Sequence, residues 1–195
     1  MTKTNKQLFD MLWDTYTDSH STVKHCSYDS QHAVHMLDSE ISCLDFDQMK
    51  ETYCRTARIA DVSSVDALLF KNETFYLVEF KNYDLKKENS QRKRHNQTGD
   101  RKIGVWKEIR LKVYESLAIL NDIFQTDLNY QQIEVIVVQP DNQRKQTAID
   151  NIRKHAAARA KEKDQIEYCR IFKQIYGFDS KKYSVKDFVT LILAS

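Results

Sequence analysis

The segment from Arg58 to Lys81 constrains the fold most, because it matches a β-hairpin in one register. A two-residue turn at Asn72-Glu73 places Lys71 opposite Thr74; Asn tolerates the left-handed backbone that such a turn requires, whereas Glu is a poor second residue. The opposed pairs are then apolar on both faces: Phe70–Phe75 and Leu68–Leu77 on one, and Leu69–Tyr76, Ala67–Val78 and Val65–Phe80 on the other. A turn shifted by one residue would lose this match, so the sequence predicts a single register.

One opposed pair in this register is charged, because Asp66 faces Glu79. Directly opposed residues have Cβ atoms about 4.5–5.5 Å apart, and like charges there destabilise the sheet. Lys81 lies two residues beyond Glu79 and therefore shares the same face. Two carboxylates this close repel each other unless a proton or a cation lies between them. A divalent cation would remove the repulsion, and Mg²⁺ typically binds one or two carboxylates together with phosphate and water.

The N-terminal residues are predicted to be mainly helical. Apolar residues at steps of three and four indicate a helix over residues 6–16. Residues 17–30 are polar and predict a loop. A weaker apolar stripe indicates one or two helices within residues 30–53.

After the hairpin, the sequence predicts a helix and then a strand. Val105 begins a stripe with four-residue spacing that indicates a helix over residues 105–124. Residues 133–138 are almost continuously apolar, which is typical of a strand buried on both faces. A helix between two strands suits a parallel, right-handed crossover. The expected fold class is therefore α/β, with a mixed central sheet, hairpin plus parallel strand, flanked by helices. A short terminal helix is predicted over residues 185–193.

The composition of the chain restricts the classes of protein to which it can belong. No stretch approaches the ~18 apolar residues of a membrane span, so no membrane association is expected. The four cysteines include no CxxC pair and are expected to be free thiols in a reducing cytoplasm. The formal net charge of +2 says little about partners.

Asp66, twelve intervening residues and then Glu79-Phe80-Lys81 resemble the signature of the PD-(D/E)XK nuclease superfamily, whose fold is restriction endonuclease-like. Val65 stands where the name of the superfamily implies proline. In the following helix, Arg110-x-x-x-Tyr114 stands where the RecB-like branch would show Gln-x-x-x-Tyr, so no branch is assigned.

The resemblance implies a Mg²⁺- or Mn²⁺-dependent deoxyribonuclease. Asp66 and Glu79 would bind the metal with the backbone carbonyl of Phe80, and Lys81 would position the attacking water. Many relatives add an acid from an upstream helix, for which Glu40 and Glu51 are both candidates. The implied partner is DNA, duplex or branched, and a homodimer is left open.

On this interpretation residues 1–195 form a single domain. Residues 1–57 are an N-terminal helical part, residues 58–140 a nuclease-like core, and residues 141–195 basic C-terminal helices. A basic stretch over residues 86–102 follows the strand of Lys81, and its Arg92, Lys93 and Arg94 are candidate contacts to the phosphate backbone.

Other interpretations remain open at this stage. The chain could be a catalytically inactive member of the same fold that binds nucleic acid or protein, since a fold does not guarantee a function. It could also be a helical DNA-binding module that uses a basic helix within residues 145–173. His20, His25, Cys26, His32 and His35 cluster in sequence, but their irregular spacing argues against a zinc site.

Overall fold

The computed structural model describes residues 3–82, 104–125, 128–140, 173 and 179–194. Its α-helices are α1 (Asn5–Thr15), α2 (Val23–Cys26), α3 (Phe46–Ala57), α5 (Val105–Phe124) and α7 (Val185–Phe188), with two 3-10 turns, η1 (Thr17–Ser19) and η3 (Tyr130–Gln132), and a π-helical segment, η4 (Val189–Leu193). Its strands are β1 (His20–Thr22), β2 (Tyr28–Asp29), β3 (Val34–His35), β4 (Ser42–Asp45), β5 (Ala67–Lys71), β6 (Thr74–Phe80), β7 (Ile133–Gln139) and β8 (Asp179–Ser184).

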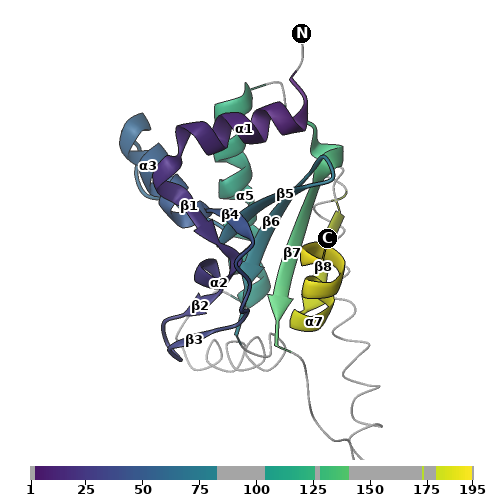
Figure 1. Ribbon diagram of the computed structural model, residues 1–195. Coiled ribbons are helices and arrows are strands. Elements are labelled where there is room, and N and C mark those ends of the chain that lie inside the picture. The colour runs from purple at the N-terminus through teal and green to yellow at the C-terminus, as the bar shows by residue number, and fades with distance from the viewer. Residues whose placement is uncertain (1–2, 83–103, 126–127, 141–172, 174–178, 195) are drawn as a thin grey trace, which may run out of the picture.

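The described part of the chain is an α/β structure built on a mixed sheet of six strands (Figure 1). The strand order is β1-β4-β5-β6-β7-β8, and β2 and β3 form a separate two-stranded sheet. Strands β1, β4, β5 and β6 pair antiparallel, whereas β6, β7 and β8 pair parallel. The expected mixed sheet of a hairpin and a parallel strand is therefore confirmed.

From Ala67 to the turn, the hairpin has the register that its sequence predicts, but the predicted Val65–Phe80 pair does not form, because Val65 and Phe80 pack in the cores on opposite faces of the sheet. Ala67 pairs with Val78, and the ladder continues to Lys71 opposite Thr74. Asn72 and Glu73 adopt φ angles of 49° and 59°. A two-residue turn of this kind requires positive φ at both positions, and Glu73 accepts that conformation even though its side chain does not favour it. The apolar pairing on both faces thus outweighs the poor turn residue.

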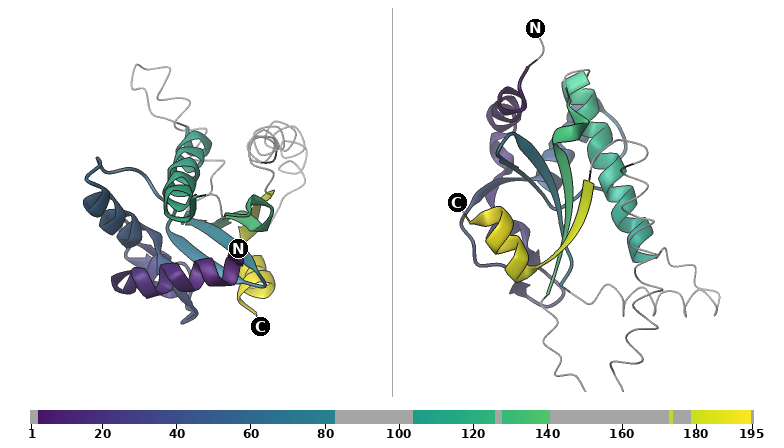
Figure 2. Two further views of the ribbon diagram at one scale, coloured as in Figure 1. Left: turned by 90° about the horizontal axis from the view of Figure 1, so that it is seen from above. Right: turned by 90° about the vertical axis from the view of Figure 1, so that its right-hand side faces the viewer.

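Helices cover both faces of the sheet, as the two views in Figure 2 show. One hydrophobic core lies between the sheet and helices α1, α3 and α5. A second core lies on the opposite face, where residues of α2, α7 and η4 pack. Strand β7 contributes Val135 and Val137 to the first core and Ile136 and Val138 to the second. This confirms the prediction that β7 is buried on both faces.

The prediction for residues 17–57 was wrong in part. The expected loop contains β1 and α2, and only α3 remains of the helices expected within residues 30–53. The strands in this region have two to four residues each, too few to produce a recognisable period. Strand β4 forms because its residues pair with β5, so tertiary context decides its structure.

Other segments follow the prediction or lie outside what the structure describes. Helices α1 and α5 occupy the expected residues, and α7 with η4 together form the terminal helix expected over residues 185–193. Strand β8 was not anticipated, because its sequence DSKKYS is largely polar. The basic stretch with Arg92, Lys93 and Arg94 lies outside the described residues, as does the predicted basic helix apart from Lys173. Among the described residues, no helix is long and apolar enough to cross a membrane.

Candidate functional site

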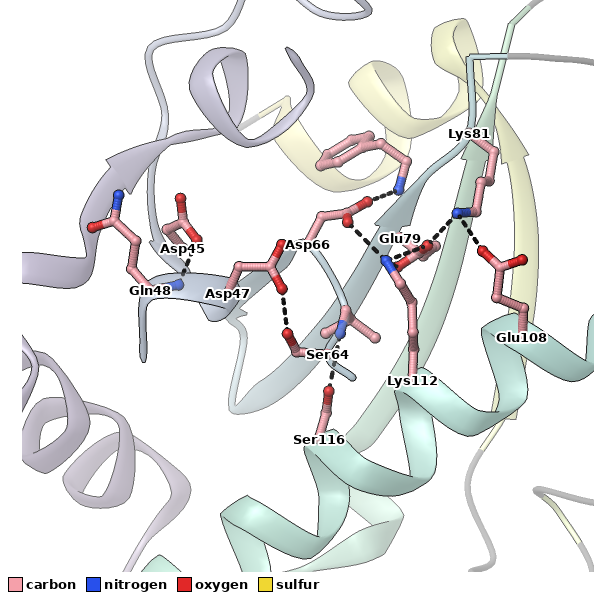
Figure 3. A network of polar contacts seen from close by, with 12 residues as sticks. Asp45, Asp47, Gln48, Ser64, Asp66, Glu79, Lys81, Glu108, Lys112 and Ser116 are labelled. Atoms are coloured by element: carbon pink, nitrogen blue, oxygen red, sulfur yellow. Dashed lines mark hydrogen bonds and ion pairs between the residues drawn. The ribbon is translucent and has the colours of Figure 1, made fainter. Parts of the chain in front are cut away.

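Glu79 lies near the end of β6 with a side chain that is fully buried. Its Oε1 lies 2.7 Å from the Nζ of Lys81 and 2.9 Å from the Nζ of Lys112 on α5. Lys81 also contacts Glu108 on α5, at 3.6 Å (Figure 3). A buried carboxylate is costly unless it is paired, and two lysines from different elements provide the pairing here.

Asp66 lies immediately before β5, and its backbone is held by hydrogen bonds to β6 and to the first residue of α3. Its N–H donates to the carbonyl of Val78 at 3.0 Å, and its carbonyl accepts from the N–H of Phe46 at 3.2 Å. Its carboxylate accepts from the N–H of Phe80 at 2.6 Å. The regular ladder ends at Ala67 and Val78, so Asp66 is not part of a ladder pair with Glu79.

The two carboxylates nevertheless lie close together. The Nζ of Lys112 is 3.3 Å from Asp66 Oδ1 and 2.9 Å from Glu79 Oε1. Asp66, Glu79 and Lys81 therefore converge on one side of the sheet, and Lys112 joins them (Figure 3). A single ammonium group lies between the two acids that the sequence singled out as metal ligands.

Helix α5 also positions the segment that leads to Asp66. The hydroxyl of Ser116 accepts from the N–H of Val65 at 3.0 Å. The carboxylate of Glu115 accepts from the N–H of Ser63 at 2.6 Å. One helix thus places Lys112 in the site and fixes the backbone that carries Asp66.

Burial dominates the electrostatics of this cluster. Burial and the nearby charge of Asp66 raise the pKa of Glu79 to about 7, against the opposing effect of the two lysines. Burial also raises the pKa of Asp66, while Lys112 and the Phe80 N–H favour its ionised form. For Lys112, burial alone would lower the pKa, but Asp66 and Glu79 together raise it. A carboxyl that titrates near neutral pH beside a fixed cation is a common property of functional sites.

A cleft of about 820 Å³ opens beside this cluster. Its lining includes Asp66, Lys81 and Glu108 together with residues 25–32. Asp45 and Asp47, at the start of α3, line it as well. Asp45 caps α3 by accepting from the N–H of Gln48 at 3.0 Å.

The structure does not place the two upstream acids suggested by the sequence in this cleft. Glu40 is exposed and lies 3.4 Å from Lys24, and Glu51 is exposed on α3. Asp47, which accepts a hydrogen bond from the hydroxyl of Ser64, is the acid of α3 that lines the cleft together with Asp66. Asp47 was not among the candidates from the sequence, because residues 42–45 were expected to be helical. The start of α3 directly after them was therefore not recognised.

Lys112 was also missed, although its position carried a signal. It follows Glu108 by four residues and precedes Val113 of the apolar stripe on α5. Glu108 and Lys112 therefore lie at the edge of the buried face, where a long side chain reaches the sheet.

The histidines that cluster in the sequence with Cys26 include two with other contacts in the structure. His20 stacks on Trp13 with ring centroids 3.8 Å apart, and His32 contacts Asp29 at 2.6 Å. Among the described residues, no three or more His, Cys, Asp or Glu side chains stand together in a geometry suited to a metal.

The residues of the cluster fit Mg²⁺ or Mn²⁺ in one respect. Asp66 and Glu79 already converge on a cation, and two carboxylates are a usual protein contribution to a Mg²⁺ site that water and phosphate complete. Lys112 occupies the position between them, so a metal ion would have to displace its ammonium group. The Phe80 carbonyl as a further ligand stays a prediction.

Comparison with known proteins finds no family model that matches the chain, and no similar curated protein or solved structure. The functional argument therefore depends on the geometry of the site.

The raised pKa of Glu79 predicts a pH-dependent stability. The unfolded carboxyl ionises near pH 4.5 and the folded one near 7, so its contribution to stability is complete below pH 4.5 and is lost as pH rises through 7. Glu79→Gln removes this titration. We expect the free energy of unfolding of Glu79→Gln, relative to wild type, to increase between pH 4.5 and pH 7 in urea denaturation.

The same substitution at exposed Glu51 is the matched control. A stability difference between Glu79→Gln and wild type that stays constant over this pH range would contradict the assignment.

Proposed function

We propose that this protein is a metal-dependent nuclease of the PD-(D/E)XK type, with a restriction endonuclease-like fold, that hydrolyses DNA phosphodiester bonds. The observation that carries the proposal is the convergence of Asp66 and Glu79 on one cation, with Lys81 also paired to Glu79. The arrangement of an antiparallel hairpin followed by a helix and a parallel strand supports it.

Each residue of the cluster has a distinct role in this proposal. Asp66 and Glu79 would hold Mg²⁺ or Mn²⁺, which, when bound, lowers the pKa of a water and stabilises charge on the phosphate. Lys81 orients the attacking water and offsets negative charge on the phosphate. Glu79 and Glu108 fix the Lys81 ammonium from two sides. Lys112 neutralises the carboxylates before the metal binds.

The acidic lining of the cleft does not favour DNA binding there, so the proposal needs DNA contacts from other parts of the chain. The cleft is lined by five acids and by one lysine: Asp29, Asp45, Asp47, Asp66, Glu108 and Lys81. A phosphate backbone approaches such a surface only with help from cations. We therefore assign contacts with DNA, duplex or branched, to the basic residues of the sequence, including Arg92, Lys93 and Arg94.

A second candidate function follows from Lys112. Its ammonium contacts both carboxylates, so the cluster is balanced without a metal. A catalytically inactive member of the same fold, acting as a nucleic-acid- or protein-binding module, would keep such an ion-pair cluster for stability. Metal binding distinguishes the two functions.

The nuclease proposal predicts that cleavage depends on Lys81. Supercoiled, linear, branched and single-stranded DNA are incubated with the protein in Mg²⁺, in Mn²⁺ and in EDTA. We expect wild type to cut at least one form only with metal, and Lys81→Ala to lose at least about 100-fold in rate. Asp66→Ala should lose both cleavage and metal binding, because it removes a ligand.

Lys107→Ala, at an exposed position of α5, is the matched control and should cut like wild type. If wild type cuts none of these DNA forms with either metal, the enzyme assignment fails and the binding module remains.

Lys112 yields a separate prediction on metal binding. In metal-free buffer, Lys112→Met should melt below wild type, because Asp66 and Glu79 then repel each other with one fewer cation between them. Added Mn²⁺ should raise its melting temperature more than that of wild type, since no ammonium competes. At a concentration of about 100 times Kd the stabilisation is about 2.7 kcal/mol, or roughly 5–10 °C.

Lys107→Met controls for the loss of one positive charge on α5. The metal site is refuted if Mn²⁺ leaves the melting curves of wild type, Lys112→Met and Lys107→Met unchanged.

A further inference from the structure

Two cysteines lie in contact at a place where a covalent bond would affect the cleft. The Sγ atoms of Cys26 and Cys43 are 3.6 Å apart. Cys26 is the last residue of α2 and lines the cleft, whereas Cys43 is fully buried in β4. Both are free thiols in this structure. We propose that Cys26 and Cys43 form a reversible disulfide that fastens α2 to β4.

The backbone around the two thiols is already held in place. The N–H of Val23 donates to the carbonyl of Ile41 at 3.0 Å, and that of Lys24 donates to Ser39 at 2.9 Å. Both bonds fix α2 against the chain that enters β4. A disulfide has an S–S distance of about 2.0 Å, so closure requires the two sulfur atoms, now 3.6 Å apart, to approach by about 1.6 Å.

The environment of the pair decides which sulfur reacts first. Its contact with Cys26, together with burial, raises the pKa of Cys43, which therefore stays a thiol. Cys26 faces the cleft and is accessible to a small oxidant such as oxidised glutathione. The Cys26 thiolate attacks one sulfur of oxidised glutathione, which breaks the glutathione S–S bond, forms a mixed disulfide with Cys26 and releases one glutathione thiolate. That thiolate accepts the proton of Cys43. The Cys43 sulfur then attacks the Cys26 sulfur, which breaks the mixed disulfide, forms the Cys26–Cys43 bond and releases the second glutathione.

The bond has a structural consequence for the cleft. Residues 27–32 follow Cys26 directly and belong to the cleft wall, and Asp45 lies two residues after Cys43. Cross-linking Cys26 to Cys43 ties these two parts of the wall together. In a reducing compartment such a bond is transient and responds to oxidation. Cys26 and Cys43 thus form a modification site, and this proposal does not depend on the proposed nuclease function.

The proposal is tested by oxidising the folded, full-length protein with glutathione disulfide, followed by acid quench, alkylation of free thiols and trypsin digestion. Both cysteines fall in one tryptic peptide, His25–Lys50, whereas Cys54 and Cys169 fall in Glu51–Arg55 and Asp164–Arg170. Mass spectrometry should find His25–Lys50 unalkylated and lighter by its two thiol hydrogens. The other two peptides should remain alkylated.

Thermal melting gives a second measurement. The oxidised protein should melt up to about 10 °C above the reduced protein, because the bridge restricts the unfolded chain. Cys26→Ser and Cys43→Ala should each abolish this shift, and Cys54→Ala should retain it. Having two variants covers the case in which Cys43→Ala does not fold.

Three results would overturn the proposal. The first is a His25–Lys50 peptide that stays fully alkylated at every glutathione ratio, which would make the contact simple core packing. The second is formation of the same bond at the same rate in urea, where the folded geometry is absent. The third is cross-linking to Cys54 or Cys169 as often as between Cys26 and Cys43.

Discussion

The balance of charge at Glu79 is the constraint on which the rest of the site depends. This carboxylate is fully buried on β6, and burial raises its pKa to about 7. Lys81 and Lys112 compensate it, one from the end of the same strand and one from α5. Because α5 also fixes the backbone before Asp66, the helix, the hairpin and the charge cluster form one unit. A change that moves α5 would therefore disturb both the core and the charge cluster.

Much of the fold could be predicted because its central elements carry strong local patterns. The hairpin was defined by apolar pairs on both faces, and β7 by a continuous apolar run. The short strands β1 to β4 could not be predicted, since they have at most four residues each and form only through pairing. Strand β8 is polar and lies at the edge of the sheet, where burial leaves little trace in the sequence.

The candidate site, like the fold, could be predicted from the sequence only in part. Asp66, Glu79 and Lys81 were brought together by the register of one hairpin, which the sequence defines. Lys112 and Asp47 come from helices whose placement against the sheet is a tertiary property. The expected Asp66–Glu79 ladder pair is replaced by a bond from the Phe80 N–H to the Asp66 carboxylate. The two carboxylates still lie close enough for the charge of Asp66 to raise the pKa of Glu79, and the ammonium group of Lys112 contacts both of them.

The most direct test of this account is to crystallise the protein with Mn²⁺ and to locate the metal by its anomalous signal. The account predicts a peak bonded to carboxylate oxygens of both Asp66 and Glu79, at about 2.0–2.2 Å. It also predicts that Lys112 has left its position between them. A crystal at saturating Mn²⁺ with no peak there, and with Lys112 still contacting both carboxylates, would contradict the account.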